Sequence, residues 1–344
     1  MKKLISLIPV IVLGSLIASV AAGAGAVKPI IVQLGIHRFD RTSAGTIVAR
    51  ATQDQVGWQL PNGDVGGFGP QTFLVGRDHS IWLDDGLNNR LLVYRAGRPK
   101  TVARVVPLRF ANADSEVALG PAGSVYTTRF LGSGAAHDYR LVLDRQTAVG
   151  KLLWESRLPS FGEEFCGALR VGPGGTLYCV GPGETWIPVA TAAGRPTSSA
   201  DRRRRTGREP VAGGLQLVSH EFAPIGASHS VSFTLLDRRG SIVRSWRIFS
   251  RSAITEARAL DSVGRDPLVV LDIQNQKSQP VPHVLWDYVV LRLGPRGAVR
   301  VALRHAIYGD NLLPDLRVGP DGALYQLSSS PSTGVEISRY SLGS

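Results

Sequence analysis

The stretch Leu316-Arg-Val-Gly-Pro-Asp-Gly-Ala-Leu-Tyr325 decides the fold, because the chain repeats it. Its copies are Leu169-Arg-Val-Gly-Pro-Gly-Gly-Thr-Leu-Tyr178, Val117-Ala-Leu-Gly-Pro-Ala-Gly-Ser-Val-Tyr126 and Phe73-Leu-Val-Gly-Arg-Asp-His-Ser-Ile-Trp-Leu83. Each copy predicts a short strand, a tight turn that needs glycine, and a second strand. The apolar residues alternate, so one face of each strand pair is expected in a core.

The spacing of these copies indicates a repeating unit of about 45–55 residues, which is typical of four-stranded propeller blades. Two weaker copies are expected between the third and the last, at Gly214–His220 and Ala257–Gly264. The sequence therefore predicts an all-β fold, a six-bladed β-propeller of four-stranded antiparallel blades. The fourth unit lacks a clear first turn, so a seven-bladed or an irregular six-bladed ring stays open.

The N-terminal part of the chain is expected to close this ring. Leu34–Phe39 and Thr46–Ala51 read as a strand pair that precedes the first unit, and the last unit ends after Val335–Ser341, its third strand. We expect an N-terminal strand to complete the last blade, because joining the first and last strands removes open sheet edges.

The first unit, Phe73–Tyr94, resembles an NHL repeat almost from end to end, with Asp84, Asn89 and Arg90 at the matching places. The resemblance covers residues 65–344 in architecture and is close only in this unit. It implies a secreted propeller and no single activity, since propellers serve many functions. We interpret the three polar residues as holding a loop through hydrogen bonds to the backbone.

Residues 1–26 have the features of a secretory signal peptide. Lys2 and Lys3 precede an apolar run at Leu4–Val20, and Ala24-Gly-Ala26 is a small-residue cleavage site. Cleavage after Ala26 would leave 27–344 as a single propeller domain, secreted to the cell envelope or the extracellular space. An uncleaved membrane anchor is the alternative. No later segment is long and apolar enough to span a bilayer, so no transmembrane span is expected after cleavage.

The two cysteines, Cys166 and Cys179, flank a glycine-rich turn between two expected strands. In an oxidising compartment an even pair of this kind predicts a disulfide across a hairpin. A metal site would need more ligands at tighter spacing.

The net charge of +12 comes mostly from arginine, and one run, Arg202, Arg203, Arg204 and Arg205, lies in the segment 192–214. We expect this segment to be a basic, disordered loop. The run is a candidate contact for an anionic polymer or lipid, and the alternative is a solvated loop with no specific role. No nucleic-acid recognition module is visible, so sequence-specific nucleic-acid binding is not expected.

Ligand sites of propellers tend to form where the loops between blades and those between second and third strands gather. The ligand-binding candidates there are Asp84, His137, Glu163, Glu164, Trp186, Asp272, His283, Trp286, His305, Asp310 and Asn311. Those with the best placing for a divalent cation, calcium or zinc, are Glu163, Glu164, His305, Asp310 and Asn311. No familiar serine-hydrolase, zinc-helix or phosphate-loop motif is present, so no catalytic residue is assigned.

Two function classes remain open from the sequence. The leading hypothesis is a secreted, monomeric binding protein that recognises a protein, a glycan or an anionic envelope polymer through its loop face. The alternative is a propeller hydrolase or lyase of the lactonase or amidating-lyase type, with calcium or zinc in the central channel. Three or more convergent acids or histidines at the channel mouth would favour the enzyme, and an apolar plug would favour binding.

Overall fold

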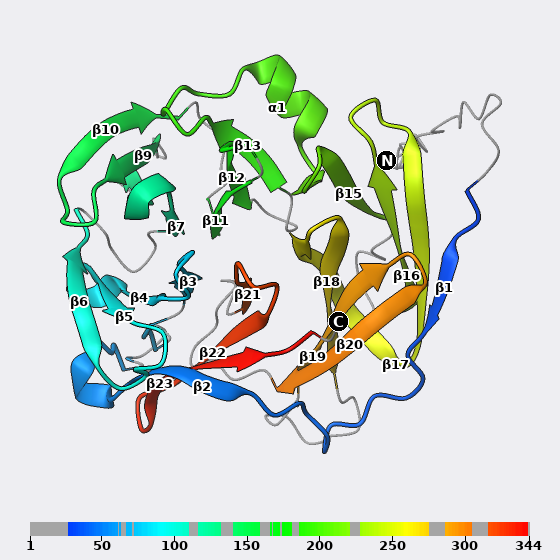
Figure 1. Cartoon of the computed structure of the whole chain (residues 1–344), viewed down its shortest axis with the longest axis horizontal. Coiled ribbons are helices and arrows are strands. Elements are labelled where there is room, and N and C mark those ends of the chain that lie inside the picture. The colour runs from blue at the N-terminus through cyan, green and yellow to red at the C-terminus, as the bar shows by residue number, and fades with distance from the viewer. Residues whose placement is uncertain are drawn as a thin grey trace, which may run out of the picture.

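The computed structural model describes residues 27–60, 62, 67–70, 72–109, 116–131, 140–158, 166, 168–172, 174–180, 186–220, 228–274, 286–304 and 316–342. These residues form 23 strands, one short α-helix and three 3₁₀ turns. The fold is all-β, and its sheets follow one another around a common centre in a propeller-like arrangement (Figure 1). No helix in the described ranges has both the length and the apolar character needed to cross a membrane.

Two four-stranded antiparallel sheets come first along the chain, each in the order expected of a propeller blade. The first sheet contains β3 (Phe73–Val75), β4 (Ile81–Asp85), β5 (Arg90–Tyr94) and β6 (Val102–Pro107). The second contains β7 (Val117–Leu119), β8 (Val125–Leu131), β9 (Arg140–Gln146) and β10 (Leu152–Arg157).

Two further sheets are also small. One has three strands, β11 (Ala168–Val171), β12 (Leu177–Val180) and β13 (Trp186–Ala190). The other has the order β2-β23-β22-β21, from β2 (Thr46–Ala51), β21 (Leu316–Val318), β22 (Leu324–Ser330) and β23 (Gly334–Tyr340). The expected pairing of an N-terminal strand with the last unit is therefore present, since β2 pairs antiparallel with β23.

The remaining strands form one eight-stranded sheet. Its path is β14 (Glu209–Val211), β15 (Leu215–His220), β16 (Ser228–Leu236), β17 (Ile242–Val263), β18 (Asp266–Gln274), β19 (Trp286–Gly294) and β20 (Gly297–Arg304). The eighth strand, β1 (Ile30–Gln33), pairs parallel with the first half of β17.

The prediction of six separate four-stranded blades is wrong for the described residues, which form four small sheets and this larger one. The reason is β17, a single strand of 22 residues. Its midpoint, Phe249-Ser-Arg-Ser-Ala-Ile254, contains no glycine or proline that would break an extended chain. The expected strand at Leu34–Phe39 is also absent, and the chain there crosses the large sheet as an irregular segment.

The segment 192–214 differs from the disordered loop that we expected. It contains helix α1 (Ser199–Arg205), which lies against β13, and strand β14. Ser198 caps the helix, because its Oγ accepts a hydrogen bond of 3.1 Å from the backbone N–H of Asp201. Arginine has a high helix propensity, which favours a helix in the basic run. The resulting helix α1 lies beside the three-stranded sheet.

Apolar side chains fill the interfaces between neighbouring sheets. Tyr126, Tyr178 and Tyr325, at the same position of three repeats, are at most 2% exposed. Each ring packs on the glycine of its own repeat, so a Cβ on Gly172 would lie 2.7 Å from the ring of Tyr178. The repeat therefore needs glycine at this position to make room for the buried aromatic ring.

Candidate functional site

The two ends of the sheets carry connections of different kinds. At one end the strands are joined by tight turns, as in 76–80 and 319–323, where the glycine N–H bonds to a carbonyl four residues on. At the other end lie the strand ends Leu131, Arg140, Val180, Trp186, His220, Ser228, Gln274, Trp286, Arg304 and Leu316, which border stretches outside the described residues. We call this second end the loop end.

Most of the candidates from sequence fall in stretches that lie outside the described residues. His137, Glu163, Glu164, His283, His305, Asp310 and Asn311 lie outside the described residues, and this set includes every metal-ligand candidate. Among the residues that the structure does describe, no group of three or more His, Cys, Asp or Glu side chains is placed to hold a metal ion. A calcium or zinc site therefore stays a prediction.

Asp272 and Trp286 are brought together at the loop end of the large sheet. The register of β18 and β19 places Asp272 opposite Tyr288 and Gln274 opposite Trp286. Residues two apart on a strand share a face, so Asp272, Trp286 and Tyr288 lie on the same side of the sheet. The Trp286 side chain is 44% exposed, whereas Tyr288 is buried.

Two charged residues of β17 join this group on the same face. Arg258 Nη1 lies 4.0 Å from Oδ2 of Asp272 and 3.6 Å from Oε1 of Glu256. The Arg258 guanidinium also stands 5.5 Å from the centre of the Tyr288 ring. We call Glu256, Arg258, Asp272, Trp286 and Tyr288 the Trp286 cluster. It combines an exposed aromatic face with charged hydrogen-bonding groups, a combination typical of ligand sites.

Trp186 lies in a different environment, in the three-stranded sheet. Its ring stands 4.9 Å from the guanidinium carbon of Arg170 and 6.4 Å from the ring of Tyr178. Arg170 in turn forms ion pairs with Glu209 of β14 and with Asp261 of β17. Trp186 therefore covers an arginine that links β11, β14 and β17.

The acidic pair at the end of β4 corrects the roles expected for the NHL-like unit. Asp85, not Asp84, holds the following loop: its carboxylate accepts hydrogen bonds from the Gly57 N–H, the Asn88 amide and the Arg90 guanidinium, at 2.8, 2.9 and 2.7 Å. Asn89 supplies a left-handed backbone conformation, with φ of 51°, and its side chain forms no hydrogen bond among the described residues. Of the three expected residues, Arg90 alone has the predicted structural role.

Asp84 points to the opposite face of β4 from Asp85. It is 7% exposed, and its Oδ1 has no hydrogen-bond partner among the described residues. Burial, reinforced by the neighbouring Asp85 charge, raises the pKa of Asp84 to about 8. A carboxyl group with such a pKa holds its proton at neutral pH, and this makes Asp84 a candidate site residue on physical grounds.

The arginine run of α1 is partly used inside the protein. Arg205 donates a hydrogen bond to the Tyr178 hydroxyl, and its guanidinium carbon stands 5.3 Å from that ring. Arg203 is exposed, Arg202 is half-buried, and the Arg204 side chain lies outside the described atoms. Contact of this run with an anionic partner stays a prediction.

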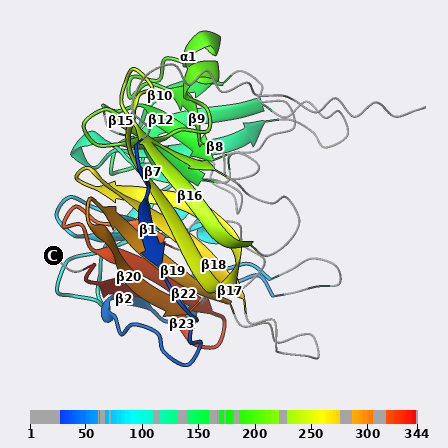
Figure 2. The ribbon, with the colours of Figure 1, turned by 90° about the vertical axis from the view of Figure 1, so that its right-hand side faces the viewer.

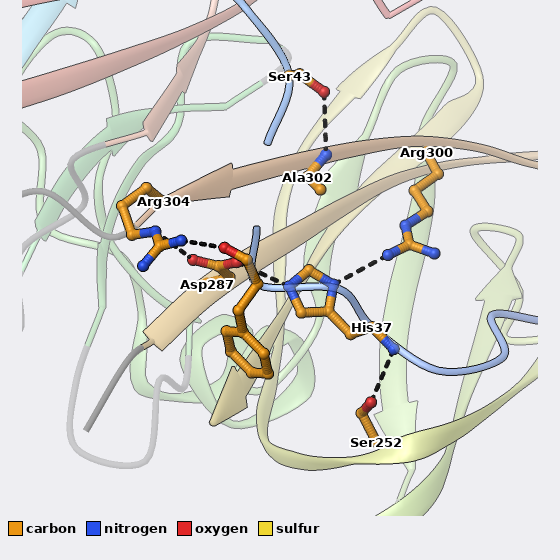
Figure 3. A network of polar contacts seen from close by, with 8 residues as sticks. His37, Ser43, Ser252, Asp287, Arg300, Ala302 and Arg304 are labelled. Carbon is orange, nitrogen blue, oxygen red and sulfur yellow. Dashed lines mark hydrogen bonds and ion pairs between the residues drawn. The ribbon is translucent and has the colours of Figure 1, made fainter. Parts of the chain in front are cut away.

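A buried polar network around His37 was not foreseen from the sequence. His37 Nε2 lies 2.8 Å from Oδ2 of Asp287, and Arg304 Nε lies 2.9 Å from Oδ1 of the same carboxylate (Figure 3). Both the His37 and the Asp287 side chains are at most 1% exposed. The backbone N–H of His37 donates to Ser252 Oγ at 2.8 Å, so the network ties the N-terminal segment to three strands of the large sheet.

The partners of His37 also fix its tautomer. Arg300 Nη2 lies 3.0 Å from Nδ1, and a guanidinium can only donate hydrogen bonds. Nδ1 must then be the acceptor, and Nε2 carries the proton that is donated to Asp287. Because both ring nitrogens form polar contacts, we interpret His37 as a structural residue that anchors the N-terminal segment and not as a catalytic base.

The predicted disulfide is confirmed, since Cys166 and Cys179 are bonded. Cys179 lies on β12, and Cys166 precedes β11, its antiparallel neighbour. The bond therefore closes the hairpin at the loop end of the three-stranded sheet.

No protein-family model matches this chain, and no curated protein matches it. Among solved structures, a streptogramin B lyase is 13% identical over 79% of this chain and 78% of its own, with a TM-score of 0.38. A PQQ-bound aldose sugar dehydrogenase from Streptomyces coelicolor is 12% identical over 86% and 96%, with a TM-score of 0.42. A puromycin hydrolase mutant is 17% identical over 82% of this chain and 43% of its own, with a TM-score of 0.40. These similarities assign no activity, ligand or residue role to this chain, and the NHL-like resemblance stays an expectation.

Proposed function

We propose that the chain forms a closed propeller that acts as a secreted binding protein through its loop end. The eight-stranded sheet supports a ring, because two sets of strands share β17, which pairs with β16 from Ile242 to Ile254 and with β18 from Ile254 to Val263. The strand β17 thus serves as the outer strand of one unit and the inner strand of the next. The pairing of β2 with β23 supports closure.

The inner strands also follow one another in the order that a ring requires. β21 contacts β3, β3 contacts β7, and β7 contacts β11, while β17 contacts both β14 and β21. The remaining step, from β11 to β14, is made by the ion pair of Arg170 and Glu209. This succession favours a ring over two stacked sheets.

The observation that carries the binding function is the exposure of Trp286 at the loop end. Trp286 begins β19 directly after the segment 275–285, and it stands beside Asp272 and Arg258. A tryptophan that is 44% exposed is able to stack on a flat or ring-shaped group of a ligand. Its charged neighbours are able to form hydrogen bonds with polar atoms of the same ligand. We infer that a glycan is the best-suited ligand, with a protein or an anionic envelope polymer as the other hypotheses.

The test is an array of bacterial envelope glycans probed with the labelled protein and with Trp286→Ala. We expect the variant to lose about fivefold or more in affinity for each glycan that the parent binds, since a stacking contact is worth about 1–3 kcal/mol. Val149→Ala is the matched control, because Val149 is 75% exposed in the tight turn 147–151 at the opposite end. Equal binding by the Trp286 variant, or equal loss in both variants, contradicts the proposal.

A further inference from the structure

The outer face of the large sheet beside the N-terminus carries exposed aliphatic and basic side chains together. On β1, Ile31 is 52% exposed, and the parallel register places it opposite Arg247 of β17. Val243, at a bulge near the beginning of β17, is 44% exposed. Figure 2 shows β1 running along β17 on this side of the molecule.

The irregular chain that follows β1 extends this surface. The N–H of Arg251, at the middle of β17, bonds to the carbonyl of Gly35 at 2.8 Å. The next residue, Ile36, is 66% exposed, more than most aliphatic side chains of the protein. We call the surface formed by Ile31, Ile36, Val243, Arg247 and Arg251 the N-terminal face.

The basic groups of this face are not neutralised within the protein. Arg247 and Arg251 are exposed, and no carboxylate pairs with either among the described residues. Arg247 lies 5.0 Å from the Phe249 ring, a contact that leaves its charge in place. By contrast, Arg129, Arg170, Arg292 and Arg339 each pair with an acid.

The neighbouring chain adds to the same charge. Lys28, Arg38 and Arg41 are exposed on 27–45, where Asp40 is the single acidic residue of the sequence. These three cations also have no carboxylate partner in the described part of the chain. Exposed cations without partners attract an anionic surface, and the attraction weakens as salt is added.

We propose that the N-terminal face binds the surface of an anionic lipid bilayer. The basic groups would contact the phosphate headgroups, while Ile31, Ile36 and Val243 reach the boundary of the acyl chains. An anionic polymer would contact only the basic groups, whereas a bilayer would also bury the three aliphatic side chains. The apolar sequence Leu4–Val20 also joins the chain just before Val27, at the beginning of this face.

Sedimentation with lipid vesicles tests the proposal. The protein used is the mature chain expected from the sequence, which begins at Val27. We expect binding to vesicles of phosphatidylglycerol and phosphatidylcholine, weak binding to phosphatidylcholine alone, and a decline in moderate salt. Arg247→Ser with Arg251→Ser should lower the partition coefficient roughly 30-fold, at about fivefold for each cation. Ile31→Ser with Ile36→Ser should lower it about tenfold.

Matched controls separate this face from the rest of the surface. Val149→Ser with Leu153→Ser removes two exposed aliphatic side chains of another sheet, and Arg202→Ser with Arg203→Ser removes charge from α1. Both controls should bind as the parent does, and all variants should show the parent's thermal unfolding. The proposal is overturned by equal binding to neutral and anionic vesicles. It is also overturned if the α1 variant alone loses binding, or if the protein binds polyphosphate and not vesicles.

Discussion

Asp84 and Asp85 are adjacent on β4, both are buried, and yet they have opposite surroundings. Three donors surround the carboxylate of Asp85, whereas Oδ1 of Asp84 has no partner among the described residues. Because successive side chains of a strand point to opposite faces, the two carboxyl groups lie on opposite sides of the first sheet. Asp85 therefore has a structural role as an ionised acceptor, whereas Asp84 keeps its proton at neutral pH.

Asp84→Asn should change how stability depends on pH. The folded pKa of about 8 lies above the value of 3.8 in the unfolded chain, so the folded state retains the proton longer. Stability is then fully present below pH 3.8 and declines as the pH rises toward 8. At roughly 1.4 kcal/mol per pKa unit, the decline reaches a few kcal/mol. We expect the variant to be the more stable protein at pH 9 and to match the parent within about 1 kcal/mol at pH 4, measured by urea unfolding. A difference that is the same at both pH values would contradict this.

Asp85→Ala should destabilise the first sheet. The change leaves the Arg90 guanidinium and the Gly57 N–H without their acceptor, and the loss of one partner from a buried ion pair typically costs 3–5 kcal/mol. We expect a fall of about 3 kcal/mol in the free energy of unfolding at pH 7. Asp54→Ala, which removes an exposed acid, serves as the control and should change stability by less than about 0.5 kcal/mol.

The roles of these two acids illustrate what a sequence can predict. The hairpins at Phe73–Leu83 and Leu316–Tyr325 form where expected, because glycine turns and strand alternation are local signals. The assignment of the loop-holding acid was wrong by one position, which in a strand reverses the face. The bond between His37 and Asp287 joins residues 250 positions apart, and no local pattern links them. The continuity of β17 likewise depends on its neighbours in space.

Asp287→Ala should loosen the N-terminal segment. It leaves the Nε2–H of His37 and the Arg304 guanidinium without their buried acceptor, and we expect a loss of roughly 3–5 kcal/mol. Trypsin should then cleave after Arg38 and Arg41 faster than in the parent protein. His37→Ala should give a similar loss, and the double variant should cost less than the sum of the two. Ser43→Ala removes only an exposed contact with Ala302 and should leave the cleavage rate unchanged.

The disulfide should contribute measurably to stability. It closes a loop between residues 13 apart, and the chain-entropy model gives about 3 kcal/mol for a loop of this size. We expect Cys166→Ala with Cys179→Ala to lower the free energy of unfolding by 2–4 kcal/mol, and dithiothreitol to shift the parent but not the variant. A parent unaffected by the reductant, with the bond shown to be reduced, would contradict the expectation.

Calorimetric titration with calcium and zinc tests the enzyme alternative. If Glu163, Glu164, His305, Asp310 and Asn311 form a metal site, one of the two ions should release or absorb heat and raise the melting temperature. Glu163→Gln with Glu164→Gln should remove the effect, while Asp54→Asn should retain it. Absence of any heat and of any thermal shift would leave the binding hypothesis alone.

The single strand β17 couples the unfolding of two parts of the large sheet. Its first half pairs with β16 and β1, and its second half pairs with β18, so one continuous strand belongs to both parts. Melting of one part would strip hydrogen bonds from the other. Hydrogen exchange should therefore find one cooperative block across the strands β14 to β20. A cut or an insertion near Ser250–Ser252 should disrupt both parts at once.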